Sequence, residues 1–239
     1  MSDIEKLLKS TPETVNPIPP PAEFSPITKE DLVEIHSLNT RLFIFFQGEI
    51  PGIKLFTGTG DTVGTENIFY NSRITFYQLL WAMAITKHPL IKEIVKPKYD
   101  KSKFDAKILV EQQIMAGMKI LDLGCGPIPV FARCARAMGA DVWTVDLKSA
   151  EEFSFNENSF TLKQRALEIQ KHIQLDLKSA EAINIIRQRS LGNFNLVTEA
   201  NLDYIDESAF SGFEGINVLP LLKRGGVSNN LDQLTLKES

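Results

Sequence analysis

The second half of the chain alternates short β-rich runs with helical patterns, and this alternation limits the fold more than any other feature. Strands that alternate with helices of about ten residues form right-handed βαβ units on a parallel sheet. The expected strands are 119–123, 141–147, 173–177, 194–200 and a fifth that begins within 221–227. The expected helices are 129–139, 161–170, 179–190 and one in the residues before 221. The predicted fold class is therefore α/β, with a doubly wound, mostly parallel sheet.

The run LDLGCGP, Leu121–Pro127, joins the first expected strand to the helix that follows it. In a doubly wound sheet, a ligand lies beyond the carboxyl ends of the strands, where the strand order reverses. Gly124 and Gly126 allow a tight turn with no side chain between the backbone and the ligand. The dinucleotide fingerprint G-x-G-x-x-G is not completed, because Pro129 stands where the third glycine is required. Asp122 would also repel a pyrophosphate, so the run disfavours NAD and FAD and favours a ligand with a cationic group.

The chain from Met118 to Val227 resembles the class I S-adenosylmethionine-dependent methyltransferases. The first motif of that family is an acidic residue followed by G-x-G. Later landmarks follow in the family's order, because Asp146 stands 24 residues after Asp122 and Asp176 stands 30 residues after Asp146. FNLVTEA resembles the family's fourth strand, and LLKRGGV resembles its turn into the fifth. The resemblance implies a Rossmann-like domain that binds S-adenosylmethionine and releases S-adenosylhomocysteine.

The resemblance also assigns roles to acidic residues. It implies that Asp146 holds the ribose hydroxyls, that Asp176 contacts the adenine amino group and that Asp122 holds the methionyl ammonium. Each has an alternative, since Asp146 and Asp176 could cap the helices that follow them and Asp122 could satisfy local backbone donors. Cys125 has no histidine near it in the sequence, so it is expected to be a small spacer and not a nucleophile. The expected cofactor contacts are Asp122, Gly124, Cys125, Gly126, Asp146, Leu147, Asp176, Leu177 and Glu199.

Methyl transfer from a sulfonium depends mainly on orientation and on a dry site. The expected catalytic residues directly follow the fourth strand and are Glu199 and Tyr204, with Asn201 and Asp203 in the same run. Glu199 is the first candidate for a proton acceptor or substrate anchor, and a solvated carboxylate is its alternative. The motifs D-P-P-Y and N-P-P-Y, which accompany amino methylation of bases, are absent. A small-molecule acceptor, methylated on oxygen or nitrogen, is therefore expected.

The N-terminal part has a different organisation. Five prolines between residues 16 and 26 favour extended backbone, and Thr28 with Asp31 resembles a capping box. The expected helices are 29–46, 66–88 and 103–115, and the expected domains are a proline-rich arm at 1–27, a helical cap or lid at 28–116 and the cofactor-binding domain at 117–239. Tyr70, Asn71 and Tyr77 are expected to contact substrate from the lid. The alternative is that this aromatic stripe is ordinary core.

Only 12 residues follow Val227, whereas the family continues through a helix and a strand hairpin. The sheet is therefore expected to be truncated to about five strands, with an exposed edge that the N-terminal helices, the arm or a second subunit would cover. A homodimer is compatible with this expectation. The short end and the few catalytic candidates leave an alternative function open, a protein that binds S-adenosylmethionine or S-adenosylhomocysteine without catalysis and acts as a regulatory or interaction subunit. An enzyme that modifies proteins is a third alternative.

The composition of the chain limits the kinds of partner that it is expected to bind. The chain has 26 lysines and arginines against 30 aspartates and glutamates, a balance that disfavours a nucleic-acid partner bound through phosphates. Its two cysteines lack C-x-x-C spacing and its three histidines lack paired spacing, so neither a disulfide scaffold nor a metal site is expected. No secretory segment and no apolar run of about 20 residues is visible, so a cytoplasmic enzyme without a membrane span is expected.

Overall fold

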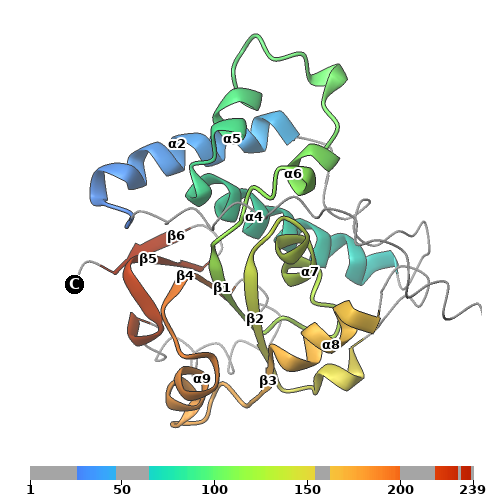
Figure 1. Cartoon of the computed structure of the whole chain (residues 1–239), viewed down its shortest axis with the longest axis vertical. Helices are drawn as coiled ribbons and strands as arrows, with labels where there is room; N and C mark the ends of the chain where they lie inside the picture. The colour runs from blue at the N-terminus through green and yellow to red at the C-terminus, as the bar shows by residue number, and fades with distance from the viewer. Residues whose placement is uncertain (1–25, 47–64, 154–161, 200–218, 231–232, 238–239) are drawn as a thin grey trace, which may run out of the picture.

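A six-stranded sheet with the strand order β3-β2-β1-β4-β5-β6 organises the protein (Figure 1). The computed structural model describes residues 26–46, 65–153, 162–199, 219–230 and 233–237. The strands are β1 (Lys119–Leu123), β2 (Asp141–Asp146), β3 (His172–Gln174), β4 (Phe194–Thr198), β5 (Leu222–Asn230) and β6 (Gln233–Leu236). The first five are parallel, and β6 runs antiparallel to β5. The predicted α/β class with a mostly parallel sheet is confirmed.

The helices alternate with the strands as the sequence predicts. They are α2 (Lys29–Phe46), α4 (Thr65–Thr86), α5 (Pro89–Ile94), α6 (Lys107–Glu111), α7 (Val130–Ala137), α8 (Leu162–Gln170) and α9 (Ala182–Ser190), with short 3-10 turns η1 (Lys101–Lys103), η2 (Ala150–Glu152) and η4 (Leu219–Leu221). The predicted capping box at the start of α2 is confirmed, since Thr28 N donates to Asp31 Oδ2 at 2.9 Å and Asp31 N donates to Thr28 Oγ1 at 3.3 Å. Among the described residues, no helix has the length and apolar character needed to cross a membrane.

Two layers of helices cover the sheet, with α2 and α4 on one side of the strands and α9 on the other (Figure 1). One core joins α2, α4 and α7 to the sheet face that carries Ile120 and Val142. A second core joins α9 to the opposite face, which carries Leu121 and Val145. The N-terminal helices therefore share their core with the sheet, and the division at residues 116 and 117 stays a prediction.

The expected limit of about five strands is wrong, because residues 233–236 form a sixth. Leu236 pairs with Val227, so β6 covers the edge of β5 that the sequence left exposed. The expected strand 173–177 is shorter than predicted, since β3 ends at Gln174. Asp176 Oδ1 then accepts a hydrogen bond from Lys178 N at 2.9 Å, which closes a turn instead of extending the strand.

Two helix boundaries also differ from the prediction. The helix expected over 103–115 is reduced to α6, which is followed by Gln113 with a positive φ of 46°. The helix expected to reach His88 ends at Thr86, and His88 Nδ1 instead accepts a hydrogen bond from Leu90 N as the N-cap of α5. The proline-rich arm up to residue 25 and the helix expected before residue 221 lie outside the described residues, apart from η4.

Candidate functional site

The candidate site lies at the carboxyl ends of β1, β2 and β4, because the strand order reverses between β1 and β4. The turn after β1 has positive φ angles of 65° at Gly124 and 70° at Gly126, a conformation that favours glycine. Its backbone is hydrogen-bonded to β2, because the amides of Gly124 and Cys125 both donate to the carbonyl oxygen of Val145, at 2.8 Å and 3.3 Å. The LDLGCGP run thus forms the tight turn that the sequence predicts, at the edge where a ligand binds in such sheets.

Asp146 connects this glycine turn to the loop after β2. Its Oδ2 accepts a hydrogen bond from Gly126 N at 2.9 Å, and its Oδ1 accepts one from Lys148 N at 3.1 Å. A Cβ atom placed on Gly126 would meet nothing within 4 Å, so the space beside the turn is open. Leu147, the next residue, is 61% exposed. The structure does not show Asp146 as the cap of the following helical turn, the alternative that the sequence left open, because Ser149 occupies the N-cap position of η2. Asp146 instead bonds Lys148 N and the more distant Gly126 N, and each carboxylate oxygen keeps a further lone pair for a ligand.

A buried polar cluster lies directly behind the turn. Asp122 on β1 has no exposed surface, and its Oδ1 lies 3.2 Å from Nε2 of Gln78 on α4. The same Nε2 lies 2.6 Å from Oγ1 of Thr198, the last residue of β4. Asp122 Oδ2 and Gln78 Oε1 find no hydrogen-bond partner among the described residues. Gln78 thus ties α4 to both strands that flank the point where the strand order reverses.

Burial is the main influence on the protonation state of the Asp122 carboxyl. It raises the pKa of the carboxyl from 3.8 to about 7, against the hydrogen bond from Gln78 and the positive charge of Arg136, while the negative charge of Asp146 raises it further. Near neutral pH, the carboxyl is therefore divided between its protonated and ionised forms. Its bond is to a side chain of α4 and not to local backbone donors. Contact between Asp122 and a methionyl ammonium stays a prediction.

Cys125 lies between the two glycines with its thiol buried. Burial and the negative charges of Asp122 and Asp146 raise the pKa of the thiol well above its usual value. A thiol in this form is a poor nucleophile, because the thiolate is the reactive species. The side chain of Cys134 is likewise buried, in α7.

The other expected cofactor contacts are more dispersed. Asp176 is exposed after β3, two strands away from β1, and Leu177 is only 8% exposed within the core beneath α9. Glu199 directly follows β4 and is half-buried at the edge that also carries the glycine turn. The structure thus brings Asp146, Gly126 and Glu199 to one edge, and it places the side chain of Leu177 in the core.

The expected lid and catalytic residues are described only in part. Tyr77 stacks on Phe43 of α2 with ring centroids 6.0 Å apart and an interplanar angle of 8°, so it packs between α2 and α4. Tyr70 and Asn71 lie on α4, but their side chains are outside the described part of the structure. Tyr204 lies outside the described residues, as do Asn201 and Asp203. Substrate contact by these residues stays a prediction.

Sequence reasoning missed Gln78 and Thr198 as members of the cluster behind the turn. One signal was present, since Gln78 is the single amide in the apolar run ITFYQLLWAMAI. A polar side chain on the buried side of a helix needs a partner, which the sequence cannot identify. Within the described residues, no cluster of histidine, cysteine, aspartate or glutamate could hold a metal ion.

Comparisons of the chain with protein-family models, with curated proteins and with solved structures find no match.

Proposed function

We propose that the protein is an S-adenosylmethionine-dependent methyltransferase that acts on a small-molecule acceptor through oxygen or nitrogen. The observation that carries the proposal is the contact between Asp146 and the glycine turn, in which Oδ2 lies 2.9 Å from Gly126 N at the carboxyl edge of the sheet. A carboxylate in this position can accept hydrogen bonds from two adjacent ribose hydroxyls, each contributing on the order of 1.5 to 3 kcal/mol. The glycine turn and Asp146 also follow one another in the order of the methyltransferase motifs that the sequence resembles.

The surroundings of Asp146 fit a nucleoside ligand. The open space at Gly126 admits a ligand against the backbone, and Leu147, 61% exposed, offers an apolar surface to a base. When bound, S-adenosylmethionine supplies a methyl group activated by a sulfonium. The protein's own contribution is then to orient the two reacting groups and to exclude water from between them.

In this proposal Glu199 accepts a proton from the acceptor, a role supported by its position directly after β4, where the strand order reverses. The buried bridge from Gln78 to Asp122 and Thr198 holds α4 against the ends of β1 and β4. This contact fixes the position of α4 relative to these two strand ends. Fixed positions of the elements around the reacting groups support alignment, the main requirement for methyl transfer.

Isothermal titration of the full chain with S-adenosylmethionine and S-adenosylhomocysteine tests the proposal. We expect micromolar binding that weakens about tenfold or more in Asp146→Asn, because the charged acceptor is lost. Asp105→Asn is the matched control, since Asp105 Oδ1 makes the same type of bond, to Lys107 N at 3.0 Å, at an exposed site elsewhere. Binding should be unchanged in this control.

Two results would decide against the proposal. If the folded wild-type chain binds neither compound, the proposed cofactor site is ruled out. Binding without release of S-adenosylhomocysteine from any of a panel of hydroxyl and amine acceptors would instead favour a regulatory protein that binds the cofactor without catalysis.

A further inference from the structure

A basic surface lies at the amino edge of the sheet, opposite the candidate site. We define this basic edge by Arg187 and Arg189 in the last turn of α9, Lys223 and Arg224 in β5, and Lys237 after β6. Lys119, the first residue of β1, fixes the end of α9 at this edge, because its Nζ donates to the carbonyl oxygens of Ser190 and Gly192 at 2.6 Å and 2.8 Å. The end of α9 and the amino ends of β1 and β4 therefore meet here.

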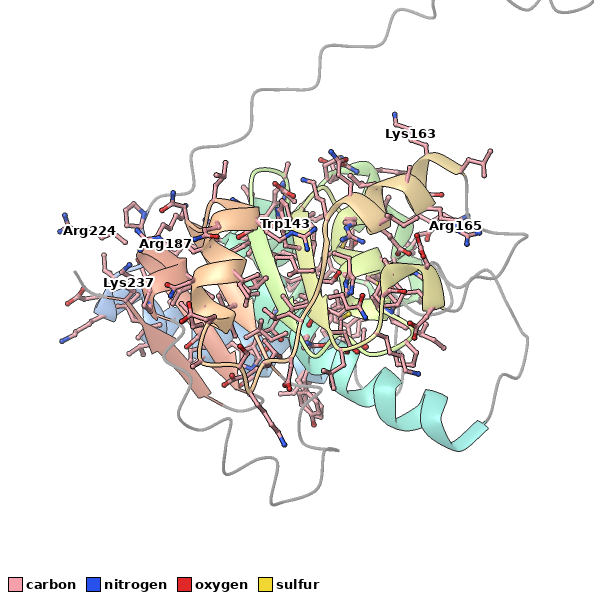
Figure 2. The ribbon with its side chains drawn as sticks, turned by 90° about the horizontal axis from the view of Figure 1, so that it is seen from below. Trp143, Lys163, Arg165, Arg187, Arg224 and Lys237 are labelled. Atoms are coloured by element: carbon pink, nitrogen blue, oxygen red, sulfur yellow. The ribbon has the colours of Figure 1, made fainter. Side chains whose placement is uncertain are left out.

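Further contacts bring the start of β5 and the end of β6 to the same edge. Lys237 Nζ donates to the carbonyl oxygen of Leu222 at 2.7 Å. A Cβ atom on Gly192 would lie 3.7 Å from Cγ of Arg187 and 3.8 Å from the carbonyl oxygen of Leu221, so Arg187 lies beside the entry to β5. Figure 2 shows Arg187, Arg224 and Lys237 together at one end of the molecule, with Lys163 and Arg165 at the other.

The described residues of α9, β4, β5 and β6 at this edge, within 182–198, 219–230 and 233–237, include no aspartate or glutamate. Asp141, which starts β2 and acts on Lys119, pairs with Lys171. Arg187, Arg189 and Arg224 are exposed, and no carboxylate among the described residues forms an ion pair with them. Exposed arginines without a carboxylate are suited to an external anion, and the planar guanidinium binds phosphate oxygens with two parallel hydrogen bonds.

Leu191 follows α9 directly at this edge. It is 78% exposed and has a φ of 63°, followed by Gly192 at 57° and Asn193 at 60°. The left-handed conformation is unfavourable for leucine, and helices usually place glycine or asparagine at such a C-terminal position. Neither backbone preference nor burial explains a leucine here. Residues held in unfavourable backbone conformations concentrate at functional sites, so the exposed apolar side chain is a second observation that points to a ligand.

We propose that the basic edge docks the protein reversibly on an anionic phospholipid surface. Leu191 enters the boundary between headgroups and acyl chains, and the surrounding arginines bind lipid phosphates. Nucleic acid would provide phosphates for the arginines but no apolar contact for the exposed leucine. A lipid surface provides both phosphates and an apolar phase, and it does not require a shaped pocket. Docking at the amino edge leaves the carboxyl edge, with Asp146 and Glu199, facing away from the membrane. The docking is thus independent of the proposed methyl transfer.

Co-sedimentation of the full chain with vesicles tests the proposal. We expect binding to vesicles of equal parts phosphatidylserine and phosphatidylcholine, little binding to phosphatidylcholine alone, and a loss of binding as salt increases. Leu191→Gly suits the left-handed backbone, so the fold is retained, and it should weaken binding about tenfold or more because the apolar contact is lost. Replacing Arg187 and Arg224 by glutamine should weaken binding about fivefold for each charge removed.

A matched control comes from α8, where Leu162 is 88% exposed next to Lys163. The double substitution Leu162→Asn with Lys163→Gln removes the same chemistry at the other end of the molecule and should leave vesicle binding unchanged. The proposal is overturned if the wild type does not sediment with anionic vesicles, or if Leu191→Gly binds them as tightly as the wild type. Tighter binding to a single-stranded RNA oligonucleotide than to vesicles, unaffected by Leu191→Gly, would overturn it in favour of nucleic acid.

Discussion

Replacing Asp122 by asparagine should stabilise the protein at neutral pH. Asp122 has no exposed surface, and burial raises the pKa of its carboxyl from 3.8 to about 7. Asparagine has the same shape and never ionises. Its amide nitrogen can donate to Gln78 Oε1 while its oxygen keeps the bond from Gln78 Nε2, which is 3.2 Å in the wild type. The substitution therefore removes a buried charge and adds an amide donor next to Gln78, whose Oε1 has no partner among the described residues.

The size of the effect follows from the two pKa values. In the unfolded chain the carboxyl loses its proton near pH 3.8, whereas in the folded protein it keeps the proton until about pH 7. The stability that the protonated form contributes is therefore fully present below pH 3.8 and is lost as the pH rises through about 7. The total corresponds to about 4 kcal/mol. We expect Asp122→Asn to match the wild type near pH 4 and to exceed it by up to about 4 kcal/mol at pH 8.

Urea unfolding of both proteins between about pH 5 and pH 8 measures this difference. The comparison must be between variant and wild type, because burial lowers the pKa of His172 below 6.5 and so destabilises both proteins as the pH falls. Asp141→Asn is the control, since its side chain is 43% exposed and pairs with Lys171. It should give no gain that increases with pH. A stability difference between Asp122→Asn and the wild type that does not change with pH would refute the reasoning.

Two further substitutions test other parts of the structure by the same unfolding assay. Glu168 has 2% of its side chain exposed and lies 2.7 Å from Arg133 Nε and 3.7 Å from Arg136 Nη1, so Glu168→Gln should cost about 3 to 5 kcal/mol by removing the negative charge between two largely buried guanidinium groups. A cost below about 1 kcal/mol would contradict a structural role for this cluster. Thr28→Ala removes the acceptor of the 3.3 Å bond from Asp31 N and should cost about 1 kcal/mol, and unchanged stability would argue against the capping box.

The sequence predicted elements whose signals are local. The apolar spacing over 29–46 and the pair Thr28 and Asp31 define α2 without reference to any other part of the chain. The runs that become β1 and β4, KILDL and FNLVT, each contain three apolar residues, and every residue except Lys119 is buried, as is typical of central strands in a parallel sheet. The glycine turn and Asp146 were likewise predictable, because a tight turn and a carboxylate at a strand end are encoded within a few residues.

Features that depend on distant partners could not be predicted in this way. β6 comprises four residues, QLTL, and becomes a strand because the edge of β5 is available to pair with it. Likewise, the 5-residue α6 has no boundary signal in the sequence, and Gln113 adopts its positive φ of 46° after the helix without a glycine at that position. In both cases the deciding contacts lie outside the local pattern, and tertiary packing overrides local preference.

Gln78 shows the same limit at the candidate site. It is separated by 44 residues from Asp122 and by 120 from Thr198, so no local pattern connects the three. The hydrogen bond from Gln78 lowers the pKa of Asp122, which means that it favours the ionised carboxylate. By thermodynamic linkage, ionisation of Asp122 must in turn favour the position of α4 in which this bond is made. The proton on Asp122 and the placement of α4 are therefore coupled, and a ligand that shifts α4 at the carboxyl edge must also change how tightly Asp122 holds its proton.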